Sequence, residues 1–252
     1  MTTVDVLLGT VREWIAGAGR LCVLTGAGMS AESGVPTFRD ALTGLWARYD
    51  PQQLATEEGF RANPQLVWDW YALRRTGVSR AQPNLGHVAI AQWEAAHPGG
   101  LTLVTQNVDD LHQRAGSCEV ICLHGAIFED RWLDDCRRRA RGEPSCDTQW
   151  ARPGSPPRCG ECGNPVRPGV VWFGEALPQH ALAAAQRAAA ECDVMLVVGT
   201  SGAVHPAAGL PVLARRAGAR VAIVNPGPSE IDDAADVLLR GTAAELLPKL
   251  LG

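Results

Sequence analysis

The chain has 252 residues, of which 46% are hydrophobic and 20% are charged, and its formal net charge is −4. This length allows one large domain, or a large and a small lobe, with a substantial hydrophobic core. The mildly acidic balance argues against a nucleic-acid-binding protein, because such a protein would carry an excess of basic residues.

The amino-terminal stretch MTTVDVLLGTVREWIAG lacks a basic segment followed by a long apolar run, so we expect no signal peptide. No apolar segment reaches the roughly 18 uncharged residues that a membrane span needs. We therefore expect a cytoplasmic protein with neither a membrane nor a nucleic acid as its partner. With no tail beyond the core, we expect it to be a monomer. Its eight cysteines would then be reduced, as core residues or metal ligands.

The first predicted element is a buried strand at 21–28, LCVLTGAG, which continues into the loop TGAGMSAESGVPTFRD. Gly26 and Gly28 let the backbone turn tightly and approach a diphosphate, and the following amides can bind the anion. Gly26-x-Gly28-x-x-Ala31 fits the loose dinucleotide-binding fingerprint. A dehydrogenase would next show a strand ending in Asp or Glu about twenty residues on. The chain instead enters a tryptophan-rich stretch, which argues against an ordinary dehydrogenase.

That stretch, about residues 43–80, is an insertion with a helical pattern. In QLVWDWYALRRTGV, Tyr71 and Arg74 stand three residues apart, so they share one face of a helix. Taken alone, the pair is more simply a surface feature, because exposed Arg near Tyr is common. The alternative is a site for a negatively charged group. Arg75 points elsewhere on the helix, and we predict that it is a surface residue.

A helix predicted at 86–97 leads to a second buried strand at 101–107, LTLVTQN. Gln106, Asn107 and Asp109 follow this strand, where doubly wound folds place ligand contacts. His124, in LHGA, is a candidate general base because histidine can accept a proton near neutral pH. We assign His87 and His112 to packing or to the surface, the usual roles of an isolated histidine.

A second insertion, about residues 125–169, is rich in Arg, Pro, Gly and Cys and cannot build a core of its own. A bound metal would stabilise it. Cys159 and Cys162 form a CxxC pair between GSPPR and GNP, which is typical of a zinc knuckle rather than a redox pair. The chain has no second CxxC, and Cys136 and Cys146 are the other cysteines nearby. We predict that four cysteines lie in the core, namely Cys22, Cys118, Cys122 and Cys192.

The last third continues the alternation, with strands predicted at 194–202 and 219–227 and helices at 179–192 and 206–218. The terminal AAELLPKLLG predicts a closing helix. Strands and helices alternating in this way predict an α/β fold with a doubly wound parallel sheet that binds ligands at the carboxyl ends of its strands.

The segments GAGMSAESGVPTFR, TQNVDDLH, LHG, VVWFGE, GTS and VNP, in this order, resemble the sirtuin family of NAD-dependent protein lysine deacylases. The resemblance implies a Rossmann-like NAD-binding domain made of residues 1–42, 81–124 and 170–252. It also implies a smaller domain made of the helical insertion 43–80 and a zinc-ribbon-like insertion, 125–169.

The resemblance also implies the roles of individual residues. NAD would be bound by Gly26, Ala27, Gly28, Phe38, Arg39, Gln106, Asn107, Asp109, Gly199, Thr200, Ser201, Asn225 and Ala243. The VVWFGE segment would be a strand that pairs with an extended substrate peptide. Its peptide-binding residues would be Val171, Phe173, Gly174 and Glu175.

The chemistry implied by the resemblance begins when the acyl oxygen of an acylated lysine attacks C1′ of the nicotinamide ribose and expels nicotinamide. His124 would act as general base on a ribose hydroxyl, and Asn107 would position the ribose and a water. The products would be free lysine and O-acyl-ADP-ribose. No hydride moves, which agrees with the missing acidic residue of a dehydrogenase.

In the branch of the family that removes succinyl and malonyl groups, a Tyr-x-x-Arg motif lines the acyl pocket. Tyr71-Ala72-Leu73-Arg74 matches this motif in the corresponding place. Arg74 would hold a distal carboxylate bidentately and Tyr71 would add a neutral donor. Ala55 matches a small residue that widens the pocket. The resemblance thus implies removal of succinyl and malonyl groups, with deacetylation as a second activity.

The zinc site departs from the family's pattern, because Trp132 and Asp135 occupy the places of its first CxxC. Three alternatives stay open. Zinc could be held by four cysteines, namely Cys136, Cys146, Cys159 and Cys162. Asp135 could supply an oxygen ligand, which zinc accepts. Or the metal is absent and the small domain packs around Trp132 and Trp150.

Other functions also stay open. One is a plain NAD-dependent deacetylase in which Arg74 makes an internal salt bridge, and another is mono-ADP-ribosylation of protein. A third is a sensor that binds NAD or ADP-ribose without turnover, against which the intact Asn107, Asp109 and His124 argue. A zinc-ribbon interaction module is least favoured, because it ignores most of the chain.

Overall fold

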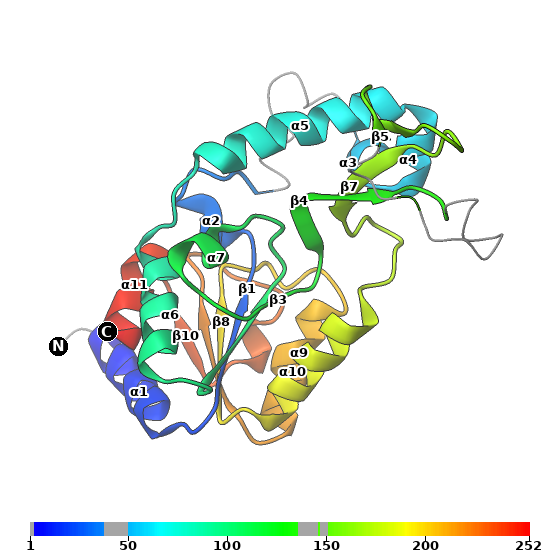
Figure 1. The fold of residues 1–252 in the computed structure, drawn as a ribbon. Coiled ribbons are helices and arrows are strands. Elements are labelled where there is room, and N and C mark those ends of the chain that lie inside the picture. The colour runs from blue at the N-terminus through cyan, green and yellow to red at the C-terminus, as the bar shows by residue number, and fades with distance from the viewer. Residues whose placement is uncertain (1–2, 38–49, 136–145, 147–150) are drawn as a thin grey trace. The chain divides into compact units, whose positions relative to one another are not determined.

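Six strands form one parallel sheet in the computed structural model, which describes residues 3–37, 50–135, 146 and 151–252 (Figure 1). The strands are β1 (Leu21–Thr25), β2 (Leu101–Thr105), β3 (Val120–Cys122), β8 (Val194–Val198), β9 (Arg220–Val224) and β10 (Val237–Leu239). Their order is β10-β9-β8-β1-β2-β3, and every neighbouring pair is parallel. The chain winds outward from the inner strand β1 to both sides, so the predicted α/β fold with a Rossmann-like sheet is confirmed.

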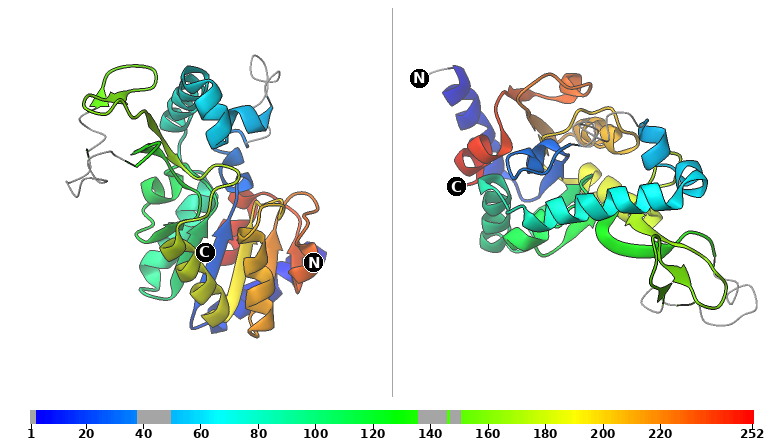
Figure 2. Two further views of the ribbon diagram at one scale, coloured as in Figure 1. Left: turned by 90° about the vertical axis from the view of Figure 1, so that its right-hand side faces the viewer. Right: turned by 90° about the horizontal axis from the view of Figure 1, so that it is seen from above.

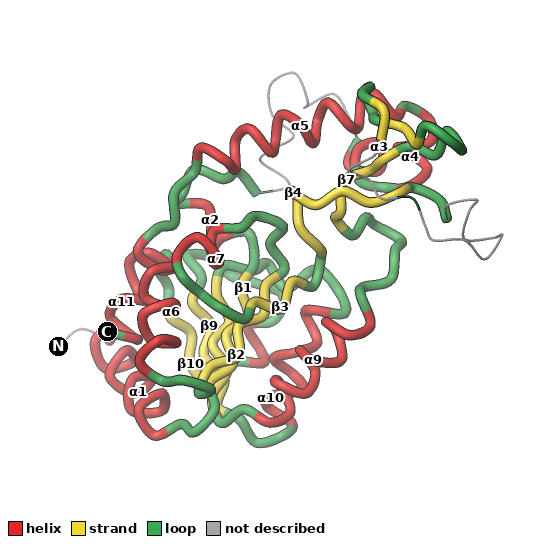
Figure 3. The backbone as a smooth tube through the Cα atoms, in the orientation of Figure 1, coloured by secondary structure: helices red, strands yellow, loops and turns green. Residues whose placement is uncertain are grey.

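Helices cover both faces of this sheet (Figure 3). On one face lie α1 (Thr3–Gly17), α6 (Leu85–Ala96) and α11 (Ala243–Leu251), and on the other lie α9 (Gln179–Glu191) and α10 (Leu210–Arg216). Successive side chains of a strand point to opposite faces. Leu21 and Val23 of β1 therefore pack in the first layer, and Cys22 and Leu24 in the second. Because both faces are covered, the interiors of the strands are mostly apolar, and such apolar runs are recognisable in the sequence.

The chain divides into two compact units. The first is made of Met1–Asp40, Ala81–His124 and Leu177–Gly252 and contains the parallel sheet. The second is made of Ala41–Arg80 and Gly125–Ala176. None of the helices in the described ranges is long and apolar enough to cross a membrane.

The second unit combines helices with two short antiparallel sheets. Its helices are α3 (Pro51–Leu54), α4 (Glu57–Ala62) and α5 (Pro64–Arg80), and α3 and α4 pack beside one end of α5 (Figure 2). Its strands pair as β4 (Gly125–Trp132) with β7 (Val166–Val170), and as β5 (Ala151–Arg152) with β6 (Arg158–Cys159). The buried side chains of Phe60, Trp70, Ile127 and Trp172 come from both of its chain segments.

Two predictions about the second unit are wrong. The VVWFGE segment is not a strand beyond its first residue, because β7 ends at Val170 and a turn follows. Gly174 has φ +85°, and the Glu175 carboxylate accepts a hydrogen bond from Trp172 N (2.8 Å), which closes the turn. Arg75 is not a free surface residue. Its guanidinium donates to Ile127 O (2.6 Å) and pairs with Asp130 (2.6 Å), so it joins α5 to β4.

The predicted core positions of the cysteines hold for Cys22 and Cys192, which are buried. They are wrong for Cys118, which is exposed, and for Cys122, which is half-buried. Both lie in or beside the edge strand β3, which has a neighbour on one side only. The apolar neighbours of Cys118 and Cys122 in the sequence therefore led to a prediction of more burial than an edge strand provides.

Candidate active site

The loops that follow β1 and β8 lie so close to each other that a side chain on Gly26, Gly28 or Gly199 would clash with the opposite loop. Gly26 N donates to Val198 O (2.9 Å) and Gly28 N donates to Gly199 O (2.7 Å). A Cβ on Gly26 would lie 2.7 Å from Thr200 Cβ, and one on Gly28 would lie 2.8 Å from Gly199 Cα. Gly199 has φ +61°, a left-handed conformation that favours glycine. These glycines thus fix two loops at the carboxyl edge of the sheet, where such folds bind ligands.

Polar side chains from three strand ends are joined at the same edge. Gln106 Nε2 donates to Thr200 Oγ1 (3.1 Å), which connects the loop after β2 to the loop after β8. Asn225 Nδ2, after β9, donates to Gly227 O (3.0 Å) and approaches Thr200 O (3.5 Å). Ser201 is exposed beside them, and Ala243 is buried at the start of α11. The residues expected to contact NAD therefore come from loops that end neighbouring strands.

A buried network of hydroxyls holds Asn107. Asn107 N donates to Thr105 Oγ1 (3.0 Å), and its Nδ2 donates to Ser30 Oγ (3.1 Å). Thr105 Oγ1 also accepts from Thr25 Oγ1 (2.8 Å). Thr25 and Thr105 are paired across β1 and β2, so they end the two strands side by side. The hydroxyls of Thr105 and Ser30 thus fix the backbone and the side chain of Asn107.

The network continues to two buried histidines. His112 Nε2 lies 3.0 Å from Thr25 Oγ1, and His87 Nε2 lies 3.5 Å from Ser30 Oγ. The two rings are 4.8 Å apart. Burial lowers the pKa of His87 to about 4, and burial together with His87 lowers the pKa of His112 to about 3. Both are neutral at pH 7 and pack in the core, which confirms the expected packing role.

Asp109 has a local structural contact. Its Oδ1 accepts from Leu111 N (3.1 Å) at the start of α7 (Leu111–Ala115). The carboxylate is buried in the folded chain. It therefore fixes the turn between Asn107 and α7.

His124 has the geometry of a general base. Its Nδ1 lies 2.8 Å from Gln106 O. A carbonyl accepts only, so Nδ1 carries the proton and Nε2 keeps its lone pair. Burial lowers the pKa of His124, and the backbone hydrogen bond to Gln106 raises it by less. The neutral imidazole is therefore the form present at pH 7, with Nε2 ready to accept a proton.

Tyr71 and Arg74 lie on α5 of the second unit. Tyr71 is 3% exposed, and its hydroxyl oxygen accepts a hydrogen bond from Trp172 Nε1 (3.0 Å). Burial raises the pKa of Tyr71, while the charge of Arg74 acts in the opposite direction. The Arg74 guanidinium carbon lies 4.8 Å from the Trp70 ring centroid and 5.7 Å from that of Tyr71. The pair thus combines a buried hydroxyl with a nearby positive charge.

The turn after β7 lies against Ala55. Phe173 N donates to Ala55 O (2.9 Å), and Ala55 is buried. Trp172 comes from the same turn and reaches Tyr71. The structure therefore groups Ala55 and Tyr71 with the residues that follow Val170.

Glu175 is bound into a cluster with two arginines. Its carboxylate pairs with Arg167, which is 2% exposed, and with Arg131 (2.7 Å). Burial raises the pKa of Glu175, but hydrogen bonds from Arg167 and Trp172 N outweigh it, so the pKa lies below its usual range. Sequence reasoning missed Arg167 and Trp172. Only the spatial contacts with Glu175 and Tyr71 distinguish them from ordinary core residues.

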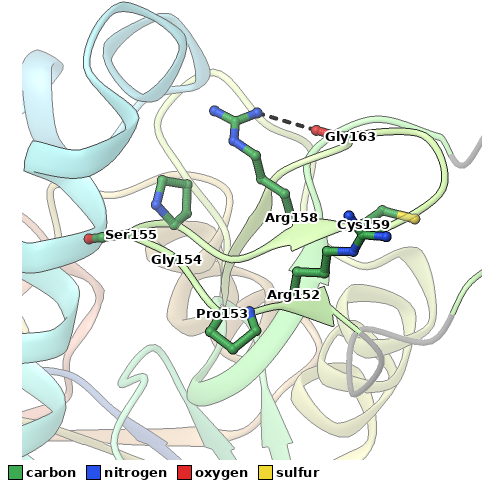
Figure 4. A pocket seen from close by; sticks show the side chains of 9 residues that line it. Arg152, Pro153, Gly154, Ser155, Arg158, Cys159 and Gly163 are labelled. Carbon is green, nitrogen blue, oxygen red and sulfur yellow. Dashed lines mark hydrogen bonds between the residues drawn. The ribbon is translucent and has the colours of Figure 1, made fainter.

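Cys146 and Cys159 lie together, with their Sγ atoms 3.5 Å apart. An open pocket beside Cys159 is lined by Arg152, Arg158 and the turn 153–156 (Figure 4). In the part of the chain that the structure describes, no three His, Cys, Asp or Glu side chains are arranged to hold a metal ion. The described residues alone therefore do not form a zinc site. Four residues of the sequence predictions lie outside the described ranges, namely Phe38, Arg39, Cys136 and Trp150.

Comparisons with known proteins agree with one another. Residues 26–206 match the family model described as the Sir2 family. The chain is 58% identical over 240 residues to an NAD-dependent protein deacylase of Ralstonia nicotianae, covering 95% of this chain and 94% of that protein.

Solved structures are similar over nearly the same length. A Sir2 homologue crystallised with NAD has a TM-score of 0.85 and 43% identity, over 96% of this chain and 92% of that chain. Sir2Tm bound to a propionylated peptide has a TM-score of 0.79 and 31% identity, over 95% of both chains.

Proposed function

Because the chain belongs to the Sir2 family and is an NAD-dependent protein deacylase, we propose that it favours succinyl- and malonyl-lysine over acetyl-lysine. The observation that carries this proposal is the buried Tyr71 hydroxyl with Arg74 one helical turn away. Succinyl and malonyl groups end in a carboxylate, whereas an acetyl group ends in a methyl. Only the acidic groups can use both a guanidinium and a hydroxyl donor.

The electrostatic surroundings of Tyr71 support an acidic ligand. After burial, the largest influence on its pKa is the charge of Arg74, and Arg167 adds a second positive charge. Glu175 is the opposing negative charge, and it is already paired with Arg167 and Arg131. A carboxylate that approaches Tyr71 would therefore come within reach of the charge of Arg74. A guanidinium suits it because it binds carboxylates bidentately and keeps its proton when desolvated.

We propose His124 and Asn107 as the residues that act in the reaction. When bound, NAD supplies the ribose carbon that receives the acyl oxygen as nicotinamide leaves. His124 Nε2 would take the proton of a ribose hydroxyl, since Nδ1 is committed to Gln106 O. The Asn107 side-chain amide, held by Ser30, would orient the ribose and a water through its oxygen. Gly26, Gly28 and Gly199 would let the backbone approach the phosphates closely, because their own amides already have acceptors, and Thr200 would contact the phosphates.

The substrate is proposed to be an acylated lysine in an extended protein segment. Sir2Tm binds a propionylated peptide, and we extend this substrate class to the present chain. The amides of Trp172 and Phe173 already have acceptors within their own unit. Peptide hydrogen bonds would therefore be made by the backbone of Val171 and Gly174. Recognition through backbone groups would tolerate many substrate sequences.

A structural zinc in the second unit is also a proposal. Cys146, Cys159 and Cys162 would need Cys136 to complete a four-cysteine site, which is the usual form of a structural zinc centre. Elemental analysis of the purified protein tests it. We expect one zinc per chain, and a Cys159→Ser variant that retains none. If the wild-type protein contains no zinc, the second unit is stabilised by side-chain packing instead of by a metal.

The acyl preference is tested with one peptide that carries succinyl-, malonyl- or acetyl-lysine, by following nicotinamide release. We expect succinyl and malonyl to give the higher kcat/KM. Arg74→Met should lower these values about 10- to 100-fold, because hydrogen bonds to charged groups contribute about 1.5–3 kcal/mol. It should leave deacetylation largely unchanged. Arg80→Met is the matched control, since Arg80 is exposed at the end of the same helix.

Two outcomes would count against the proposal. If acetyl-lysine is the better wild-type substrate, the chain is a plain deacetylase. If Arg74→Met lowers all three activities alike, Arg74 has a structural role, such as an internal salt bridge.

A further inference from the structure

We propose that Trp172 is a positioning residue for acyl recognition: its indole N–H holds the oxygen of the Tyr71 hydroxyl and leaves the hydroxyl proton for the carboxylate of the substrate. This inference rests on the proposed preference for acidic acyl groups. It adds to the Tyr71–Arg74 pair a residue that acts through Tyr71 rather than on the substrate.

The direction of the hydrogen bond follows from the chemistry of the two groups. Trp172 Nε1 lies 3.0 Å from the Tyr71 hydroxyl oxygen, and an indole nitrogen can only donate. Tyr71 is therefore the acceptor, and its O–H is available to a second partner. Among the described residues, the structure shows no acceptor for this proton. A buried donor without an acceptor is costly, so a ligand that accepts it gains affinity.

The contact also strengthens Tyr71 as a donor. Accepting a hydrogen bond polarises a hydroxyl and makes its own proton a better donor. In agreement, the hydrogen bond from Trp172 lowers the pKa of Tyr71 against the larger effect of burial, which raises it. A methyl-terminated acyl group has no oxygen at this place and gains nothing from the arrangement. The effect is therefore selective for acidic acyl groups.

Trp172 is itself fixed by contacts with three residues, namely Phe60, Arg167 and Glu175. It is 2% exposed, and its ring lies 5.3 Å from the ring of Phe60. The Arg167 guanidinium carbon lies 3.2 Å from the Trp172 ring centroid, and the carboxylate of Glu175 accepts from Trp172 N. Arg167 also pairs with Glu175, so one ion pair fixes both the ring and the backbone of Trp172. An indole fixed in this way can keep Tyr71 in one orientation.

The test compares Trp172→Phe with Trp68→Phe on the succinyl and acetyl peptides. Phe keeps an aromatic ring and removes the N–H. Trp68 is the matched control because it lies half-buried on α5, one turn from Tyr71. We expect Trp172→Phe to lower desuccinylation kcat/KM about tenfold, the lower end of what a hydrogen bond to a charged group contributes, and to change deacetylation less than about threefold. We expect Trp68→Phe to change neither substrate selectively.

Coupling between the two residues is tested by a double-mutant cycle. In a Tyr71→Phe background, Trp172→Phe should cause no further selective loss, because the hydroxyl that it positions is gone. An independent readout is the phenol titration of Tyr71. The chain has two tyrosines, so a Tyr49→Phe background isolates Tyr71 for ultraviolet titration. Trp172→Phe should raise the pKa of Tyr71, and Trp68→Phe should not.

The possible failures are distinguishable. A wild-type enzyme without succinyl preference overturns the proposed function itself. A preference that Tyr71→Phe and Arg74→Met abolish but Trp172→Phe retains overturns this inference alone. Equal losses on both peptides make Trp172 a packing residue only. If Trp172→Phe does not fold, benzothienylalanine at position 172 replaces the N–H by sulfur within nearly the same shape, and the same outcomes apply.

Discussion

Replacing Gly199 by alanine should lower stability and weaken NAD binding without changing the preference between acyl groups. Gly199 has φ +61°, and a Cβ there would lie 2.5 Å from Gly28 C and 2.8 Å from Gly28 Cα. The groups it would meet are backbone atoms, which cannot turn away as a flexible side chain can. The loops after β1 and β8 must therefore separate, or the backbone must change conformation.

The expected cost follows from two effects. A left-handed conformation costs a non-glycine residue about 1–2 kcal/mol. Overpacking in a close-packed region costs about 1–3 kcal/mol. The Gly199→Ala variant should thus lose about 2–5 kcal/mol, out of a typical total of about 5–15 kcal/mol. Gly34→Ala isolates the first effect, because Gly34 has φ +80° and no atom within 4 Å of an added Cβ.

Urea denaturation followed by circular dichroism measures the stabilities, and the KM for NAD measures the site. We expect Gly199→Ala to be the least stable variant and to raise the KM for NAD. The ratio of succinyl to acetyl kcat/KM should stay constant, because the Tyr71–Arg74 pair belongs to the other unit. Gly9→Ala, in α1 with open space, should be neutral or stabilising. A Gly199→Ala variant as stable as Gly34→Ala, with normal KM for NAD, would refute the close-approach argument.

Three further predictions concern the buried polar groups. Because burial lowers the pKa of His124 below 6.5, the acid limb of the kcat/KM profile should lie below pH 6.5, and a limb above that value would contradict the proposed base. The pKa values of His87 and His112 in the folded chain are about 4 and about 3, below the ordinary value of 6.5, so the stability that depends on their neutral forms is fully present above pH 6.5. It is lost as the pH falls from 6.5 to about 4 for His87 and to about 3 for His112. Each should remove about 1.4 kcal/mol of unfolding free energy per pH unit, and equal urea midpoints at pH 7 and pH 5 would contradict this. Thr25→Val should cost about 1–3 kcal/mol in the same assay, because it leaves buried partners of Thr25 unsatisfied, and an unchanged midpoint would show that the network relaxes.

Much of the fold could be predicted because its strands are buried on both faces. Such strands are continuous apolar runs, and β1, β2, β8 and β9 all have this form. The two outer strands escaped prediction, since β3 and β10 have only three residues each. A run of that length carries no periodic signal, and its role becomes visible only when the neighbouring strand is in place.

In the candidate site, too, contacts between residues far apart in the sequence could not be predicted. His124 and Asn107 could be proposed as acting residues from local motifs. The hydroxyls that hold Asn107 could not, because Thr25 and Thr105 are 80 residues apart and meet only through strand register. The apolar run of Val170, Val171 and Trp172 predicts a strand where the structure has a turn at 171–175. In the structure the Trp172 amide donates to the Glu175 carboxylate rather than to a neighbouring strand, and the apolar run does not encode this contact.

The contacts of Glu175 predict an effect on acyl specificity that needs no contact between Glu175 and the substrate. The motif suggests a peptide contact, yet its carboxylate is occupied by Arg167, Arg131 and the amide of Trp172. Removing it would leave Arg167 buried without its partner and free the backbone of Trp172, so the Tyr71 hydroxyl would lose its fixed orientation. A loss of Glu175 would then lower acidic-acyl activity even if the peptide still binds. The KM for peptide and the succinyl-to-acetyl ratio respond differently to the two roles, so Glu175→Gln can assign the residue to one of them.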